Sequence, residues 1–290
     1  MFFGNIERPP RLSEFQLEVP EKLIGQRPYK KRDECKLMVL DKKDGSIQHK
    51  KFKDITSLFN KGDVLVLNNT QVFSARLFAS KEKSDSKVEV FLLRELDNDL
   101  WEAMVKPARK VRIGNKLYFN NEIACDVIDN TVSGGRVLRF EYNGENLYSF
   151  IDKNGFSPLP PYIKRDPIPE DKKNYQTVYA SRRGSVAAPT AGLHFSKDLL
   201  KKLEKKGVKV AYVTLHIGLG TFRSILVEDL TRHHMDSEYY EVPQETADLI
   251  NEAKAKKKKV WTVGTSTVRT LETVVVSGFQ ITPKQGWTDK

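Results

Sequence analysis

The pattern of hydrophobic and polar residues changes twice along the chain. Between residues 73 and 152, short alternating or apolar runs are separated by turn-forming residues; the runs include ARLFAS, KVEVFLLREL, WEAMVK and RVLRFEY. Strands this short, about 8–12 residues apart, are typical of a small antiparallel barrel or sandwich. We therefore predict a small all-β barrel domain over residues 73–152.

The flanking regions show a different pattern. A strand-like run, DVLVLN, precedes the β-rich region, and a Pro-rich connector, SPLPPYIKRDPIP, follows it. Beyond the connector, helices expected at 196–207, 243–259 and 268–278 alternate with strands expected at 208–214 and 260–264. This alternation builds a parallel or mixed sheet with covering helices. The predicted fold is α/β (α+β): a discontinuous main domain with a mixed sheet, residues 1–72 and 153–290, and the barrel inserted between them.

Composition narrows the class of protein. The net charge of +11 indicates an anionic partner, nucleic acid first, although a basic solvated surface is the alternative. No apolar run approaches the ~18 residues that span a bilayer, and the amino-terminal residues meet Pro and charge too early for a secretory signal. Cys35 and Cys125 form no CxxC motif. We therefore expect no membrane association, and a cytoplasmic location.

Three segments carry candidate chemistry. The stretch VAAPTAGLHF (186–195) combines small residues with one imidazole, His194, as the lining of a pocket would. Two others follow predicted strands, where open α/β sheets bind ligands. LHIGLGTFR (215–223) offers His216 and Arg223, and GTSTVRT (264–270) places hydroxyls and Arg269 at a helix N-terminus, which favours anions.

A fourth segment, RHHMDSEYYEV (232–242), holds His233, His234, Asp236 and Glu238. This spacing differs from the HExxH of zinc enzymes, so general acid–base chemistry is favoured and no metal is expected. The sequence contains no GxSxG and no GxxxxGK[ST], and its GLG lacks the third glycine of a dinucleotide fingerprint. Serine hydrolase, NTPase and nicotinamide chemistry are therefore disfavoured.

These segments, with YQTVYA (175–180) and DVLVLNNTQVFSARLF (63–78), resemble the S-adenosylmethionine:tRNA ribosyltransferase-isomerases of queuosine biosynthesis. The likeness covers nearly the whole chain, in order. It implies an α/β domain with an inserted barrel. It also implies transfer and isomerisation of the ribosyl unit of S-adenosylmethionine onto 7-aminomethyl-7-deazaguanine at the tRNA wobble position. Adenine and methionine leave, the methyl group stays on methionine, and neither a metal nor an obligate protein partner is expected.

The resemblance identifies candidate positions. For catalysis we expect His194, His216, His233 and Glu238. For substrate binding we expect Tyr175, Thr190, Ala191, Gly192, Gly218, Gly220, Thr221, Arg223, Thr265, Ser266 and Arg269. The small residues would let the backbone approach the adenosyl group. His194 or His216 would move protons, and Arg223 or Arg269 would hold a carboxylate or phosphate.

The chain departs from the family pattern in three places. Asp236 stands where the family usually has a second His of HxMH, and Asn174 replaces an Arg. The sequence also ends at GWTDK, where the family continues with another strand and helix. Two alternatives therefore stay open: a basic RNA-binding protein without catalysis, and, more weakly, a methyltransferase.

Overall fold

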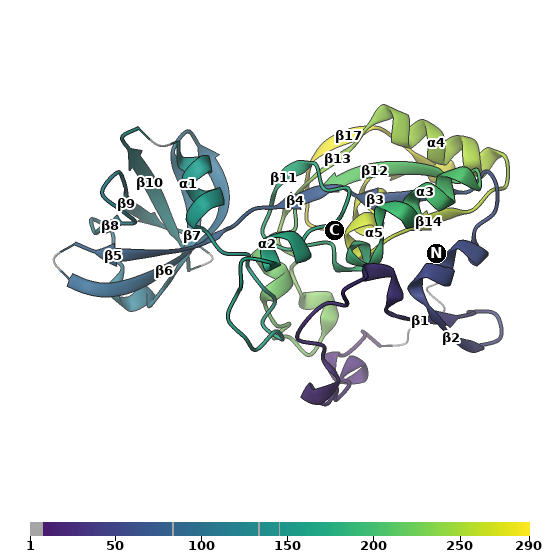
Figure 1. Cartoon of the computed structure of the whole chain (residues 1–290), viewed down its shortest axis with the longest axis horizontal. Coiled ribbons are helices and arrows are strands. Elements are labelled where there is room, and N and C mark those ends of the chain that lie inside the picture. Colours follow the sequence, from purple (N-terminus) through teal and green to yellow (C-terminus); the bar gives the residue numbers. More distant parts are fainter. Residues whose placement is uncertain (1–7, 83, 133, 145) are drawn as a thin grey trace.

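The computed structural model describes residues 8–82, 84–132, 134–144 and 146–290. A β-barrel lies beside a larger body in which helices cover a mixed sheet (Figure 1). This is the fold class expected from the sequence. Within the described ranges, no helix is both long and apolar enough to cross a membrane.

The barrel closes in the strand order β10-β7-β6-β5-β8-β9, with antiparallel neighbours. Its strands are β5 (Arg76–Lys81), β6 (Ser84–Asp97), β7 (Leu100–Lys106), β8 (Lys116–Tyr118), β9 (Ile123–Asn130) and β10 (Arg136–Tyr142). Alternate residues of each strand point inward, as Trp101, Ala103 and Val105 do from β7. Helix α1 (Leu147–Asn154) adds Phe150 and Ile151 to the same core.

The main sheet has the order β14-β3-β12-β13-β17. Strands β14 (Val260–Thr262), β3 (Val64–Asn68) and β12 (Lys209–Leu215) are parallel, whereas β13 (Glu238–Val242) and β17 (Lys284–Thr288) add antiparallel pairs. Side chains of β3 alternate between two cores. Val64 and Val66 pack with residues of helices α4 (Gln244–Ala255) and α5 (Thr265–Val274), and Leu65 and Leu67 pack with residues of helix α3 (Lys197–Lys205). The predicted mixed sheet is therefore buried on both faces at β3, as the run of four apolar residues in this inner strand requires.

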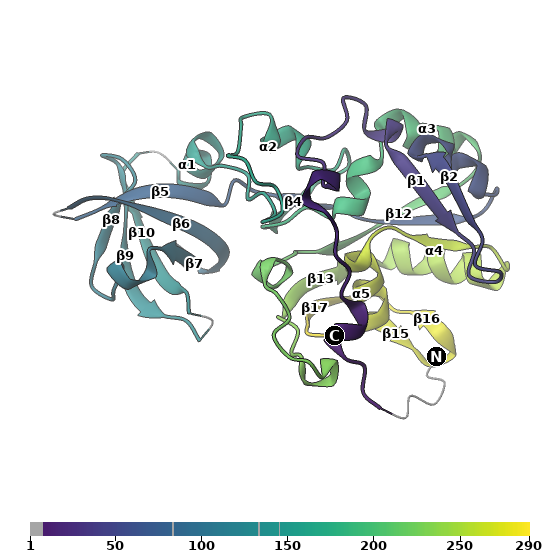
Figure 2. The ribbon, with the colours of Figure 1, turned by 90° about the horizontal axis from the view of Figure 1, so that it is seen from below.

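The helices lie on both sides of this sheet (Figure 2). Helix α3 (Lys197–Lys205) begins after Ser196, whose hydroxyl accepts the Leu199 N–H at 3.1 Å as an N-cap. Helix α4 (Gln244–Ala255) ends before the run of four lysines, contrary to the predicted end at 259, because Lys257 has φ +54°. Helix α5 (Thr265–Val274) begins and ends earlier than expected.

Smaller elements connect these parts. They are the hairpin β1 (Lys36–Leu40) and β2 (Ile47–Lys51), the parallel pair β4 (Thr70–Val72) and β11 (Arg182–Ser185), helix α2 (Asp171–Asn174), and the pair β15 (Val275–Val276) and β16 (Gln280–Ile281). Phe73 belongs to the barrel core, while Val72 packs with Tyr175 and Ala188. The division into domains at 72/73 and 152/153 stays a prediction.

Candidate active site

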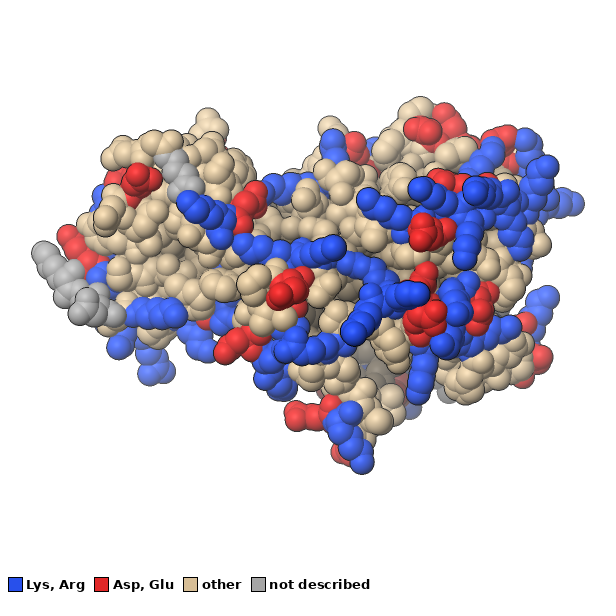
Figure 3. Space-filling view, in the orientation of Figure 1, with Lys and Arg blue, Asp and Glu red and all other residues tan. Residues whose placement is uncertain are grey.

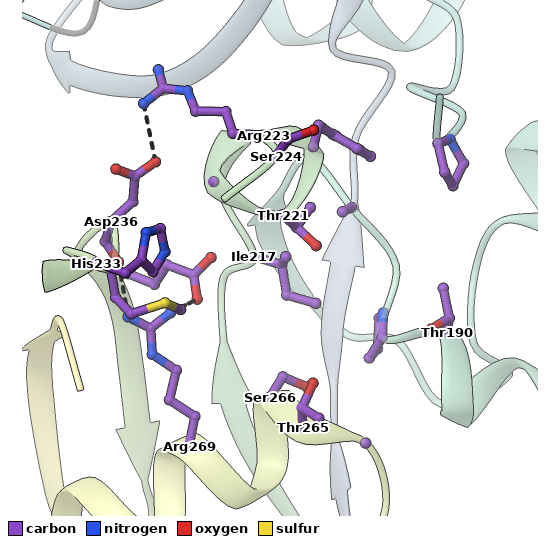
Figure 4. Close-up of a pocket in the computed structure, with 18 of the residues that line it drawn as sticks. Thr190, Ile217, Thr221, Arg223, Ser224, His233, Asp236, Thr265, Ser266 and Arg269 are labelled. Carbon is purple, nitrogen blue, oxygen red and sulfur yellow. Dashed lines mark hydrogen bonds and ion pairs between the residues drawn. The ribbon is translucent and has the colours of Figure 1, made fainter. Parts of the chain in front are cut away.

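A cavity of about 1090 Å³ opens above the carboxyl ends of the parallel strands, and is called the first cavity here. Figure 4 shows Arg223, Asp236 and Arg269 on one side of it and Thr190 on the opposite side. A second cavity of about 630 Å³ adjoins it toward the barrel. Arg223, Asp236 and Glu238 line both cavities, so these side chains stand at the boundary between them.

Small side chains line part of the first cavity. They come from Ala187, Ala188, Thr190 and Ala191 of the stretch that the sequence singled out. Opposite them, helix α5 begins after Gly264, which has φ +83°, a backbone conformation that suits glycine. The pattern of short side chains lets a ligand approach the backbone.

The start of α5 is fixed to the sheet. The Asn68 amide donates from Nδ2 to the Leu215 carbonyl at 3.0 Å and to the Ser266 hydroxyl at 3.1 Å. Its Oδ1 accepts the backbone N–H of Thr70 and of Leu215. One side chain at the end of β3 therefore positions β12, β4 and Ser266 together.

Glu238 is the first residue of β13 and is buried. Its Oε1 accepts the backbone N–H of Gly218 at 2.8 Å, and its Oε2 accepts from Arg269 Nη1. Arg269 also donates from Nη2 to the carbonyls of Asp236 at 2.8 Å and Thr288 at 3.0 Å. Burial raises the pKa of Glu238 above its usual value, although the Gly218 N–H and Arg269 oppose that rise.

A second, more exposed ion pair lies close by. Arg223 Nη1 approaches Asp236 Oδ2 at 3.4 Å, and both side chains are partly in solvent. A Cβ added to Gly220 would come within 2.8 Å of that same oxygen, so a side chain at position 220 would displace Asp236. Arg223 is held less tightly than Arg269 and is the cation better able to turn toward a ligand.

His216 faces the second cavity. Its Nδ1 lies 2.8 Å from the Thr70 hydroxyl, and its ring stacks on Tyr239 with centroids 5.5 Å apart. Burial, with a smaller effect of Arg182, lowers the pKa of His216 to about 4. The imidazole is therefore neutral at neutral pH, where it can accept a hydrogen bond but does not serve as a protonated acid.

Two predicted site residues lie elsewhere. His194 Nδ1 contacts the Cys35 sulfur at 3.1 Å, its ring packs on Phe52, and it lines neither cavity. Gly192 also lines neither cavity; a Cβ there would meet the Tyr179 hydroxyl at 2.1 Å. The glycine is needed for packing against Tyr179, and the histidine faces away from the ligand space.

The structure brings the other predicted residues together. The first cavity is lined by Tyr175, Thr190, Ala191, Gly220, Thr221, Arg223, His233, Glu238, Thr265, Ser266 and Arg269, and the second by His216, Gly218, Arg223 and Glu238. Burial raises the pKa of Tyr175 to about 12, so its hydroxyl stays protonated. Across the described ranges, no group of three or more His, Cys, Asp or Glu side chains is arranged to hold a metal ion.

Comparison with known proteins places this site in a family. The sequence model of the queuosine biosynthesis proteins matches residues 12–290. The chain belongs to that family. Curated relatives named S-adenosylmethionine:tRNA ribosyltransferase-isomerase come from Flavobacterium psychrophilum and Chloroherpeton thalassium. Each is 51% identical, over 286 and 283 residues respectively, and each alignment covers 97% of this chain and 82% of the relative.

A solved structure is also similar to this member of the queuosine biosynthesis family. The S-adenosylmethionine tRNA ribosyltransferase from Thermotoga maritima is 28% identical, with a TM-score of 0.44. The alignment covers 96% of this chain and 77% of that one.

Sequence reasoning missed the side chains that the barrel, β11 and β17 bring to the second cavity of this family member. Trp101, Arg183 and Trp287 are among them. Each lies in a stretch whose local pattern indicates only a strand or a turn. The one available signal was Trp287 itself, because it stands in the polar segment KQGWTDK, whose pattern gives it no buried face to occupy. The structure shows this side chain to be exposed.

Proposed function

We propose that this protein transfers the ribosyl unit of S-adenosylmethionine to 7-aminomethyl-7-deazaguanine at the tRNA wobble position and isomerises it to give epoxyqueuosine. Adenine and methionine leave, and the methyl group is not donated. The observation that carries the proposal is the family match over residues 12–290, with 51% identity to curated enzymes of that name. A binding protein without catalysis is not favoured by this match.

The first cavity is the proposed site for S-adenosylmethionine. Its volume of about 1090 Å³ leaves room for both a nucleoside and an amino-acid part. The small side chains of residues 187–191 leave room for the flat adenine ring to lie close to the backbone of this stretch. Arg223, the less constrained of the two cations, is the proposed partner of the methionine carboxylate.

Glu238 is the proposed proton-transfer residue. It stands where the two cavities meet, and its raised pKa brings it closer to neutral pH, where a carboxylate works best as a general base. Its negative charge also suits a sulfonium or ammonium group. His216 lies on the side of the second cavity and offers a neutral imidazole as a hydrogen-bond acceptor.

The proposed partner is tRNA. On the face seen in Figure 3, Lys and Arg side chains form a band that runs from the barrel junction across the larger body. With the net charge of +11, this surface suits a phosphate backbone. We propose no obligate protein partner and no metal, and we place the reaction in the cytoplasm with its tRNA substrate.

The test is to incubate the purified protein with S-adenosylmethionine and precursor tRNA and to measure the products. We expect free adenine and methionine in equal amounts, one of each per modified tRNA, and none from Glu238→Gln at the same protein concentration. S-adenosylhomocysteine with methylated tRNA would show a methyltransferase instead. Bound tRNA without released adenine would support the RNA-binding alternative.

A further inference from the structure

The second cavity has a lining unlike that of the first. It lies between barrel strands β6 and β7 on one side and β13, β17 and the loop after β12 on the other. Its lining combines five aromatic side chains with charged groups of both signs: Phe73, Trp101, Tyr148, Tyr239 and Trp287, with Glu95, Glu102, Asp236 and Glu238 and with Arg94, Arg183 and Arg223. Flat apolar surfaces beside hydrogen-bonding groups of both kinds suit a planar ligand that carries donors and acceptors.

Two buried donors in this lining have no acceptor among the described residues. Trp101 is 4% exposed, and its indole N–H makes no hydrogen bond. Arg183 donates from Nη1 to Asp152 at 2.7 Å and lies over the Tyr148 ring at 5.2 Å, but its buried Nη2 has no partner. Buried donors are nearly always satisfied in folded proteins, so these two indicate that a ligand supplies the acceptors.

A stacking surface completes the cavity. Trp287 is 55% exposed, with its ring edge-to-face against Tyr239 at a centroid distance of 6.0 Å. The Arg94 guanidinium lies 5.3 Å from the Trp287 ring centroid. An exposed indole held on two sides is a platform on which a base can stack.

We propose that the second cavity receives the wobble base of the tRNA, turned out of the anticodon stack, with Trp287 as its stacking platform. This inference rests on the proposed function. A 7-deazaguanine offers ring N–H and amino donors for Glu95 or Glu102, and a carbonyl acceptor for the free Trp101 N–H. Its aminomethyl group then extends toward Asp236 and Glu238, at the boundary with the first cavity, where it meets the ribose of S-adenosylmethionine.

The lining of the cavity favours a base over the other parts of the substrates. Arg94, Arg183 and Arg223 line it beside the four carboxylates, and Arg94 and Arg223 are paired with two of these, so no excess of one charge selects the ligand. The aromatic rings instead favour a flat group such as a base. At about 630 Å³ the second cavity is also smaller than the first, in keeping with a base and not a whole S-adenosylmethionine. Enzymes that act on a base commonly turn it out of its stack into such a pocket.

The experiment compares two fluorescently labelled anticodon stem-loops, one carrying 7-aminomethyl-7-deazaguanine at the wobble position and one abasic there. For the unaltered protein we expect anisotropy titrations to give roughly tenfold tighter binding of the base-carrying stem-loop, the typical effect of one stacked base. Trp287→Ala should abolish this preference without changing the affinity for the abasic stem-loop. Trp101→Phe, which keeps an aromatic side chain but removes the indole N–H donor, should reduce the preference for the base-carrying stem-loop.

Tyr118→Ala is the matched control, since Tyr118 is an exposed barrel aromatic outside both cavities, and the preference should persist in it. Equal binding of both stem-loops by the unaltered protein overturns the inference. So does a loss of S-adenosylmethionine affinity in Trp287→Ala, measured calorimetrically without RNA. Adenine release by the unaltered protein tests the proposed function separately, because stem-loop binding needs no turnover.

Discussion

Glu238 and Arg269 form an ion pair whose side chains are only 8% and 13% exposed. The pair joins the first residue of β13 to the second turn of α5. Glu238 lines both cavities, and Arg269 lines the first. Two backbone carbonyls, of Asp236 and Thr288, occupy the other Arg269 terminal nitrogen. Arg269 therefore organises the site around Glu238, and it is less free than Arg223 to bind substrate.

Breaking this pair from one side should destabilise the fold. Arg269→Gln leaves the Glu238 carboxylate buried with only the Gly218 N–H, and we expect a loss of about 3–5 kcal/mol in the free energy of unfolding. The double variant Glu238→Gln/Arg269→Gln should lose less than the sum of the single variants. Urea unfolding of all four proteins measures this coupling, and strictly additive losses would contradict it.

The pH dependence of turnover should report Glu238. A general base must be deprotonated, so kcat should rise with pH through the raised pKa of Glu238 and level off above it. Arg269→Gln removes a charge that favours the carboxylate, which raises this pKa further and moves the rising limb to higher pH. The rate of adenine release in single-turnover experiments between pH 4.5 and about 8 gives the pH profile of both proteins. A rising part of the profile that stays at the same pH in Arg269→Gln would assign the ionisation to another group.

Local patterns predicted most of the fold. The apolar run at 64–67 lies in the inner strand β3, and the alternating runs at 76–106 form barrel strands. These patterns are recognisable because a strand that is buried on one or both faces needs apolar residues at the buried positions. Strands β13 and β17 were not predicted. The acids and histidines before Tyr239 suggested chemistry instead of a strand, and KQGWT is polar and contains Gly286. Their pairing with each other stabilises them, and no local pattern shows that pairing.

The site was predictable where it follows strand ends. Segments 217–223 and 264–269 follow β12 and β14 and meet at the first cavity, since the parallel strands of the main sheet point their carboxyl ends to one edge. Residues 187–191, which the sequence singled out for their small side chains, line the same cavity. The direction of a single side chain was not predictable, as His194 shows by packing on Phe52. The barrel's share of the second cavity arises from contact between distant parts of the chain, which periodicity within Trp101's own strand cannot reveal.

Gly192 should be required by Tyr179 and not by substrate. Gly192→Ala places a methyl group against the Tyr179 hydroxyl, and we expect a destabilisation of about 1–3 kcal/mol from overpacking. Tyr179→Phe removes that hydroxyl, which is buried and has no partner among the described residues, so the same glycine substitution should be tolerated in this background. The test is to compare the melting temperatures of the unaltered protein, the two single variants and the double variant. An equal fall in melting temperature on Gly192→Ala with Tyr179 and with Phe at that position would show that the added methyl group meets something other than the Tyr179 hydroxyl.

Binding of tRNA should weaken steeply as salt is added. If 6–10 phosphate contacts are made, affinity should fall roughly 10³–10⁵-fold between about 50 and 200 mM salt, because each contact releases counterions. Filter binding across that range gives the slope. Affinity for S-adenosylmethionine, measured in the same buffers, is the control and should change far less. A tRNA affinity that does not change with salt would show that the basic residues behind the net charge of +11 do not contact the RNA.

His216 should make stability depend on pH between its unfolded and folded pKa values. Burial lowers the pKa of His216 from the ordinary 6.5 to about 4, so between these pH values the imidazole is protonated in the unfolded chain but not in the folded one. The contribution of the neutral His216 to the free energy of unfolding is therefore fully present above about pH 6.5 and is lost as the pH falls toward 4. His216→Gln should flatten this dependence. The matched control His49→Gln, on exposed β2, should keep it. Unfolding free energies at several pH values from 4 to 7 measure both, and an unchanged slope in His216→Gln would show that another group titrates.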